Sequence, residues 1–322
     1  MKYNRTLQTK EFVELLKPNG KLRWLFDFVK QHRELDFLTG NVKGKEWISV
    51  YRGLSKILQI NATSEKIVAD TKFQTLAPNL FSKTINDNFQ NELVALINEI
   101  PKSENDKLHR YYENKKEGFY QNKLSRKYGI NSEADSEFVI IDKEVVVSYD
   151  TKKEKENLLL PIQEKFQQLQ KVIAEKDTKH FGTKEKKFGN ELDFLALDKD
   201  GNVLLIEYKH GTNTSGIYWS SLQVGVYYEI FKALDKKEFE KSIFEMLKQK
   251  QEIGLINPNW KTPREIKEII PVVMISEFDE NKGVAKKQFD EVLNLAINSK
   301  KNLDFLKSLQ LYKYNNGTLV RI

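Results

Sequence analysis

The stretch NELDFLALDKDGNVLLIEYKHG, residues 190–211, decides the fold of this chain, because it has the pattern of two apolar strands joined by a turn. Three acids and a lysine interrupt these strands, namely Glu191, Asp193, Glu207 and Lys209. Charged side chains are rarely buried unless they are paired or bind a metal ion. Their presence in an otherwise apolar hairpin therefore indicates a site that uses charge.

The length of the turn sets which of these side chains face each other. Side chains alternate along a strand, so Glu191 and Asp193 share one face, and Glu207 and Lys209 share one face. A three-residue loop that ends at a left-handed Gly201 pairs Asp193 with Glu207 and Glu191 with Lys209. A two-residue or four-residue loop shifts the pairing by one residue and sends the acids to opposite faces.

The three-residue loop predicts a metal site. In that register the Cβ atoms of Asp193 and Glu207 lie about 5 Å apart. Two carboxylates at this distance repel each other unless a cation lies between them, and oxygen ligands of this kind suit Mg²⁺ or Mn²⁺. Lys209 can hold a water molecule or offset charge on a phosphate. The group therefore predicts metal-assisted hydrolysis of a phosphodiester.

The residues around the hairpin predict helices and further strands. Apolar residues recur at steps of three and four in 152–177 and in 215–234, which is typical of helices, and 268–277 has the pattern of a buried strand. We expect two strands around a tight turn in 137–150, a helix around 284–298 and a hairpin closed by Asn316-Gly317. This order indicates an α/β fold with a mixed β-sheet flanked by helices.

The first part of the chain has a different pattern. Helical spacing of apolar residues is found in EFVELLKPNGKLRWLFDFVKQH (11–32), ISVYRGLSKILQI (48–60) and NDNFQNELVALINEI (86–100). We therefore predict a mainly helical N-terminal region over 1–135, which selects the substrate, and a second domain over 136–322.

Composition narrows the classes of partner. The 53 Lys and Arg residues outnumber the 46 Asp and Glu residues, and the resulting net charge of +7 favours a polyanionic partner. Cysteine is absent, which excludes disulfides and thiolate metal sites and suits the cytoplasm. No apolar run approaches the roughly 18 residues of a membrane span, so we expect no membrane partner. A G-x-x-x-x-G-K-[ST] phosphate loop is also absent.

The residues of the hairpin resemble the motif of a known family. Asp193 followed by Glu207-Tyr208-Lys209, on a hairpin between two helices, resembles the PD-(D/E)XK nuclease superfamily over about residues 155–277. Leu192 stands where the family motif has proline. Gln223 and Tyr227 have the Q-x-x-x-Y spacing of the RecB-like branch. The resemblance implies a restriction-endonuclease-like core and Mg²⁺-dependent (or Mn²⁺-dependent) cleavage of DNA or, less often, RNA.

The resemblance also implies roles for single residues. Asp193, Glu207 and the main-chain carbonyl of Tyr208 are the implied metal ligands, and Lys209 orients the attacking water. Gln223 is implied to position the substrate or the lysine.

Other candidates are less specific. Tyr227 and His210 are candidate substrate-binding residues, because Tyr227 follows Gln223 by one helical turn and His210 can reach a phosphate. The acid that the family has on its first helix is assigned to Glu164. Glu156 and Glu175 remain alternatives on the same helix, and a catalytic Glu191 makes all three unnecessary.

Two alternative interpretations remain open at this point. The chain can be a nucleic-acid-binding protein whose nuclease-like domain is degenerate and does not catalyse. The segment NKLSRKYGINSE (122–133) resembles the first helix and turn of a helix-turn-helix. The basic residues of 107–128 are interleaved with Tyr111, Tyr112, Phe119 and Tyr120, a composition that binds nucleic acid.

The partner we expect is nucleic acid, DNA in the first place. The oligomeric state stays open, with a homodimer as one option.

Overall fold

The computed structural model describes residues 1–62, 67–68, 89–99, 116–176, 181, 188, 191–279, 284–299, 303–315 and 317–322. The chain divides into two compact units. Unit 1 consists of Met1–Tyr3, Asp142–Glu240 and Thr262–Ile322, and unit 2 consists of Asn4–Ile141 and Lys241–Lys261. The predicted division at residue 135 is contiguous, whereas here a short segment from the second half of the chain belongs to the same unit as the N-terminal part.

The hairpin of residues 190–211 is formed by β6 (Leu192–Asp198) and β7 (Val203–His210), which pair antiparallel. The pairing runs from Phe194 opposite Ile206 to Leu197 opposite Val203. Three residues therefore connect Asp198 to Asn202, and the predicted register is confirmed.

The conformation of Gly201 fixes the length of this loop. Its φ is +91°, which only glycine adopts without strain, and a Cβ atom there would lie 2.3 Å from the carbonyl oxygen of Glu265. The Asp198 carboxylate accepts hydrogen bonds from the backbone N–H groups of Asp200 (3.0 Å) and Asn202 (2.7 Å). A local Asx turn and a glycine together hold the three-residue connection.

The sheet of unit 1 has six strands in the order β10-β9-β8-β7-β6-β5. β8 pairs parallel to both β7 and β9, whereas β6 pairs antiparallel to β7, and β10 antiparallel to β9. The sheet is therefore mixed, as the sequence predicts. The remaining strands are β5 (Phe138–Val145), β8 (Ile269–Ser276), β9 (Gln310–Asn315) and β10 (Thr318–Arg321).

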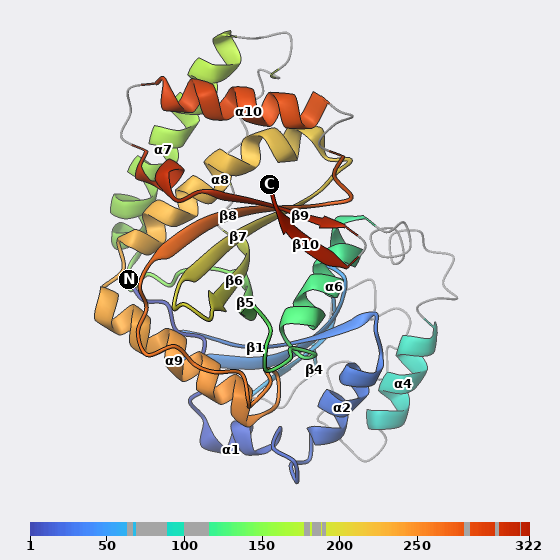
Figure 1. Cartoon of the computed structure of the whole chain (residues 1–322). Helices are drawn as coiled ribbons and strands as arrows, with labels where there is room; N and C mark the ends of the chain where they lie inside the picture. The colour runs from blue at the N-terminus through green and yellow to red at the C-terminus, as the bar shows by residue number, and fades with distance from the viewer. Residues whose placement is uncertain are drawn as a thin grey trace. The chain divides into compact units, whose positions relative to one another are not determined.

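Helices flank this sheet. α8 lies against β7 and β8, and α7 and α10 pack against α8 (Figure 1). A Cβ atom at Gly225 of α8 would lie 2.7 Å from the ring of Phe166 on α7, so the glycine allows the two helices to approach closely. The helices of unit 1 are α7 (Lys152–Lys176), α8 (Thr214–Lys232), α10 (Val284–Ile297) and the short 3₁₀ helix η2 (Asp304–Lys307). Helix α9 (Lys236–Glu252) begins in unit 1 and continues into the segment Lys241–Lys261 of unit 2. The sequence predicts α7, α8 and α10, but α9 was not expected.

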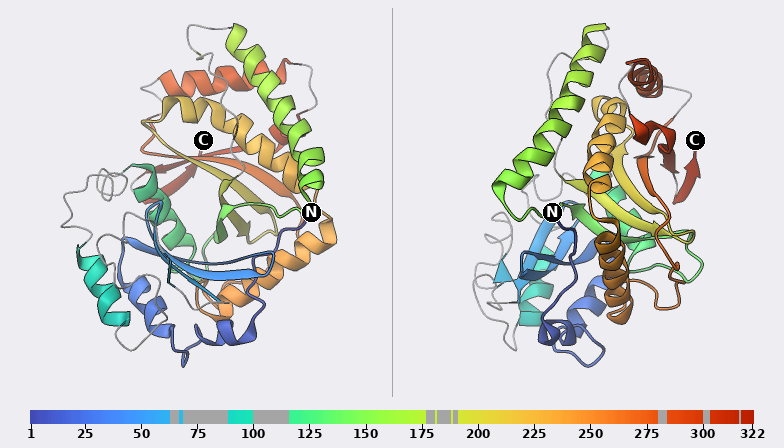
Figure 2. Two further views of the ribbon diagram at one scale, coloured as in Figure 1. Left: turned by 180° about the vertical axis from the view of Figure 1, so that it is seen from behind. Right: turned by 90° about the vertical axis from the view of Figure 1, so that its left-hand side faces the viewer.

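Unit 2 contains a four-stranded antiparallel sheet in the order β1-β2-β3-β4, part of which is seen from behind in Figure 2. Its strands are β1 (Leu35–Val42), β2 (Lys45–Arg52), β3 (Ser55–Asn61) and β4 (Ile67–Val68). The helix predicted over 48–60 is therefore wrong, and the described part of 1–135 combines this sheet with helices. Residues 48–60 form strands because Gly53, at a φ of +58°, closes a turn between them, and β-branched Ile48 and Val50 pack into the core.

The apolar face of this sheet is covered by helices. Side chains of β1, β2 and β3 share a buried cluster with α1, α2 and α4, which Ile253 and Leu255 join from the segment Lys241–Lys261. The predicted helix over 11–32 is two helices, because Pro18, Asn19 and Gly20 interrupt it. The helices of unit 2 are α1 (Lys10–Glu14), α2 (Arg23–Gln31), α4 (Phe89–Glu99) and α6 (Glu117–Tyr128).

Two local predictions are wrong. Residues 137–150 do not form a hairpin, because β5 pairs with β6, while Ser148 forms an isolated bridge with Lys2. The helix-turn-helix alternative is not formed either: α6 ends at Tyr128, and turns lead from there directly into β5.

The C-terminal hairpin is confirmed. Asn315 pairs with Thr318, which leaves a two-residue connection, and Gly317 has a φ of +81°. Asn316 lies outside the described residues, as do Tyr111 and Tyr112. Among the described helices, none combines the length and apolar character that crossing a membrane requires.

Candidate metal centre

The register of the hairpin brings two of the predicted acids together. One step beyond the Phe194 and Ile206 pair, the same register sets Asp193 opposite Glu207. The backbone N–H of Tyr208 donates a hydrogen bond of 2.7 Å to Oδ2 of Asp193, which fixes the orientation of that carboxylate. The Asp193 side chain is 22% exposed and that of Glu207 only 1%.

The ammonium group of Lys209 lies at the point where these groups meet. Its Nζ donates to the carbonyl oxygen of Tyr208 at 2.9 Å, contacts Oε1 of Glu207 directly, and lies 3.8 Å from Oδ2 of Asp193. The Lys209 side chain is 10% exposed. The three oxygens that the resemblance implies as metal ligands therefore converge on one cation, so two carboxylates and one main-chain carbonyl form a site for positive charge.

The donor set fits a hard divalent cation. Two carboxylates and one main-chain carbonyl supply only oxygen, which is the ligand chemistry of Mg²⁺ and Mn²⁺. Within the residues that the structure describes, no three His, Cys, Asp or Glu side chains gather into a metal-binding group. A set of two carboxylates and one carbonyl leaves coordination positions for water, which Mg²⁺ usually retains.

Helix α8 holds the start of β6 in place. The hydroxyl of Tyr227 donates a 2.6 Å hydrogen bond to the main-chain carbonyl of Glu191, two residues before Asp193, and the side chain of Gln223 hydrogen bonds to the same hydroxyl. Burial, together with the negative charge of Glu207, raises the pKa of Tyr227, so the hydroxyl stays protonated and keeps donating. The Q-x-x-x-Y pair thus acts on the backbone next to the acids.

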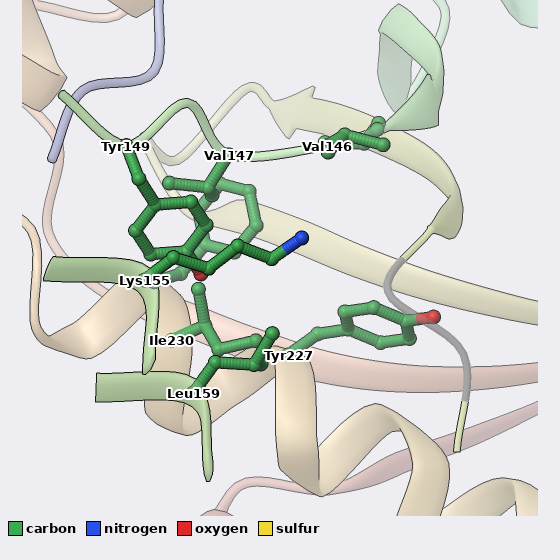
Figure 3. Close-up of a pocket in the computed structure, with 9 residues that line it drawn as sticks. Val146, Val147, Tyr149, Lys155, Leu159, Tyr227 and Ile230 are labelled. Atoms are coloured by element: carbon green, nitrogen blue, oxygen red, sulfur yellow. The ribbon is translucent and has the colours of Figure 1, made fainter. Parts of the chain in front are cut away.

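A small cavity borders the ring of Tyr227. It measures about 40 Å³ and lies between α7, α8 and the segment that follows β5 (Figure 3). Tyr149, Lys155 and Leu159 line its other sides, and the Tyr227 hydroxyl points away from Tyr149. Ligand pockets usually measure roughly 300–1,000 Å³, so this cavity has room for a few waters and not for a nucleotide.

Comparison of the chain with protein families, curated proteins and solved structures finds no match.

Three other predicted residues differ from the convergent groups in exposure or in the face of the strand that they occupy. Glu191 precedes β6 and is exposed, and Glu164 is exposed on α7. His210 follows Lys209 on β7, so its side chain lies on the opposite face of the strand, where its Nδ1 is 2.9 Å from Oγ1 of Thr212. The alternative acids Glu156 and Glu175 are exposed on α7 as well.

The contact between Tyr227 and Glu191 is the feature that sequence reasoning missed. The spacing of Gln223 and Tyr227 predicts a shared helix face, but it does not say which backbone group that face meets. A buried tyrosine needs a partner for its hydroxyl, and this rule was the available signal.

Replacing Tyr227 with phenylalanine is expected to loosen the metal centre. The change leaves the Glu191 carbonyl without its donor, which costs about 1–3 kcal/mol in the free energy of unfolding. Because Asp193 follows two residues later, we also expect metal affinity to fall about 10–100-fold, as for other outer-shell partners. Thermal unfolding and calorimetric Mn²⁺ titration measure the two effects separately.

Tyr228→Phe is the matched control, because it removes the same atom from the neighbouring, half-buried tyrosine of α8. It should leave Mn²⁺ affinity unchanged. If Tyr227→Phe lowers stability but binds Mn²⁺ as the unchanged chain does, the tyrosine stabilises the fold without positioning the acids.

Proposed function

We propose that this protein is a metal-dependent nuclease that hydrolyses phosphodiester bonds, in DNA in the first place. The observation that carries the proposal is the convergence of Asp193, Glu207 and the Tyr208 carbonyl on one position for positive charge, which the ammonium group of Lys209 holds. The RecB-like branch of the PD-(D/E)XK superfamily is the family that we propose, with a restriction-endonuclease-like core. The helix, hairpin and parallel-strand order of unit 1 supports this assignment.

The residues divide the work as follows. Asp193, Glu207 and the Tyr208 carbonyl would hold Mg²⁺ or Mn²⁺, and the ion would supply a water of lowered pKa and neutralise charge on the phosphate. Lys209 orients the attacking water and donates to the developing negative charge. Gln223 and Tyr227 keep the start of β6 in the position that the acids need.

A cleavage assay with metal removal tests the proposal. The purified full chain is incubated with linear duplex, circular duplex and single-stranded DNA and with RNA, in Mg²⁺, in Mn²⁺ and in EDTA. We expect cleavage of at least one DNA substrate with either metal and none in EDTA. Asp193→Asn should lower the rate by more than about a hundredfold, since even outer-shell changes cost 10–100-fold.

Asp200→Asn is the matched control, because Asp200 is an exposed acid at the tip of the same hairpin. It should cleave at the unchanged rate. Cleavage that survives Asp193→Asn would point to another site or to a contaminant. Binding of nucleic acid without cleavage in either metal would instead favour a degenerate domain that only binds.

A further inference from the structure

Helix α6 in unit 2 presents a stripe of lysines and aromatic rings. Phe119, Tyr120, Lys123 and Lys127 share one face of the helix, because Lys123 follows the two rings by four and three residues and Lys127 follows Lys123 by four. Lys116, the N-cap residue, lies three residues before Phe119. The three lysines are exposed and the two rings are half-buried. We call these five residues the α6 stripe. None of them is acidic.

The opposite face of α6 is buried and fixes the rotation of the helix. Ser125 donates a 2.6 Å hydrogen bond to the Asp36 carboxylate, and the side-chain amide of Asn122 donates to the carbonyl of Glu34 at 3.0 Å. The Arg126 guanidinium donates to three main-chain carbonyls, at 2.6, 2.8 and 2.9 Å, around the end of α2 and the start of β1. The lysines of the stripe are therefore held outward by buried polar contacts.

The stripe matches a polyanion in charge and spacing. Nζ of Lys123 lies 4.5 Å from the centre of the Phe119 ring, a cation–π distance that restrains the long side chain. Lys123 and Lys127 are one turn apart, about 6 Å along the helix axis. A nucleic-acid strand carries one charge per roughly 3.4 Å, so it can meet both ammonium groups at once.

The net charge of the chain is concentrated in the same unit. Unit 2 contains 26 Lys and Arg residues against 20 Asp and Glu residues, so it accounts for +6 of the net charge of +7. The acids of the candidate metal centre belong to unit 1. Attraction of a polyanion by unit 2 is therefore a property separate from the metal centre.

We propose that the α6 stripe binds the phosphate backbone of nucleic acid through Lys116, Lys123 and Lys127. The stripe gives unit 2 a docking surface that does not read sequence, because phosphate contacts carry no base information. The choice of nucleic acid as the polyanion rests on the proposed function, but the binding itself requires no catalysis.

Binding in EDTA, where no metal supports cleavage, tests the stripe. The variant Lys116→Gln/Lys123→Gln/Lys127→Gln is compared with Lys236→Gln/Lys237→Gln/Lys248→Gln, which removes the same charge from exposed lysines of α9. Fluorescence anisotropy follows labelled single-stranded and duplex DNA between 50 and 200 mM salt. The stripe variant should bind at least about tenfold more weakly, with a salt slope shallower by about 2–3, and the α9 variant should change less than about threefold.

Each outcome of the binding experiment either supports or overturns the proposed role of the α6 stripe. Equal weakening in both variants would overturn the proposal, because the stripe would then be one part of a diffuse positive surface. Binding to anionic lipid vesicles in place of either DNA would overturn it as well. Unchanged thermal unfolding shows that the stripe variant is folded. Stripe-dependent binding without cleavage in Mg²⁺ would refute the nuclease and keep the stripe, whereas cleavage with stripe-independent binding would do the reverse.

Discussion

Lys209→Met is expected to bind Mn²⁺ more tightly than the unchanged chain and yet to lose cleavage. The Lys209 ammonium lies on the same three oxygens that we assign to the metal ion, so lysine and metal compete for them. The electrostatic interaction energy of two unit charges 4 Å apart is about 4 kcal/mol at an effective dielectric constant of 20. Releasing part of this repulsion should tighten Mn²⁺ binding about tenfold or more, as measured by calorimetric titration.

The cleavage rate of Lys209→Met should fall, although its affinity for Mn²⁺ rises. A single donor to charge that develops in a transition state contributes about 10²–10³-fold, so cleavage by Lys209→Met should fall by that amount even at saturating metal. Lys199→Met, at the exposed tip of the hairpin, is the matched control and should change neither quantity. Metal affinity that stays the same or weakens in Lys209→Met would show that the lysine and the ion do not share these oxygens.

The same variant should depend on metal for its stability. Without the lysine, the Glu207 carboxylate is 1% exposed and has lost its counter-ion. Breaking a buried ion pair by removing one partner costs about 3–5 kcal/mol. In EDTA the midpoint temperature of thermal unfolding should therefore lie well below that of the unchanged chain. Mn²⁺ should restore most of this difference, because it binds to the folded state.

Glu207→Gln, combined with Lys209→Met, is expected to recover stability without recovering function. Glu207→Gln alone removes the carboxylate in direct contact with the buried ammonium of Lys209, which lies 3.8 Å from the Asp193 carboxylate. The double variant removes both charges, and replacing a buried pair by neutral groups is often neutral or stabilising. We expect it to be more stable than the sum of the single changes predicts, by at least about 2 kcal/mol.

Chemical denaturation of all four proteins in EDTA measures this coupling energy. Metal titration provides the second measurement, because both variants that lack Glu207 should bind Mn²⁺ more than about a hundredfold more weakly. Additive effects on stability would mean that Glu207 and Lys209 do not form the buried pair that their contact indicates. Retained metal binding in Glu207→Gln would remove this residue from the ligand set.

The register that brings the candidate acids together could be predicted from the sequence, because it depends on residues close together in the chain. Asp193 and Glu207 belong to one hairpin, and the loop between their strands is short enough for Gly201 and Asp198 to set the register. Strand alternation then determines which side chains share a face. A loop of two or four residues would have sent the acids to opposite faces, and the left-handed conformation of Gly201 is the one that the three-residue loop requires.

The N-terminal region was predicted poorly because its pattern has two interpretations. Residues 48–60 space their apolar side chains in a way that fits both a helix and two strands around a turn. Pairing with β1 decides between them, since Ile48 lies opposite Thr39 and Val50 opposite Phe37. The partner strand β1 lies outside the segment 48–60, so the spacing of apolar residues within that segment does not reveal the pairing.

By itself, the sequence determined the hairpin, its register and the oxygen donors that face one another across it, because turn chemistry and strand alternation act over a few residues. Only the tertiary structure decided what surrounds them. The Tyr227 hydroxyl meets the Glu191 carbonyl because α8 packs on the sheet, and Lys209 becomes the counter-ion because its neighbours exclude water. Burial is a property of the packed fold, and it raises the free-energy cost of leaving these charges unpaired.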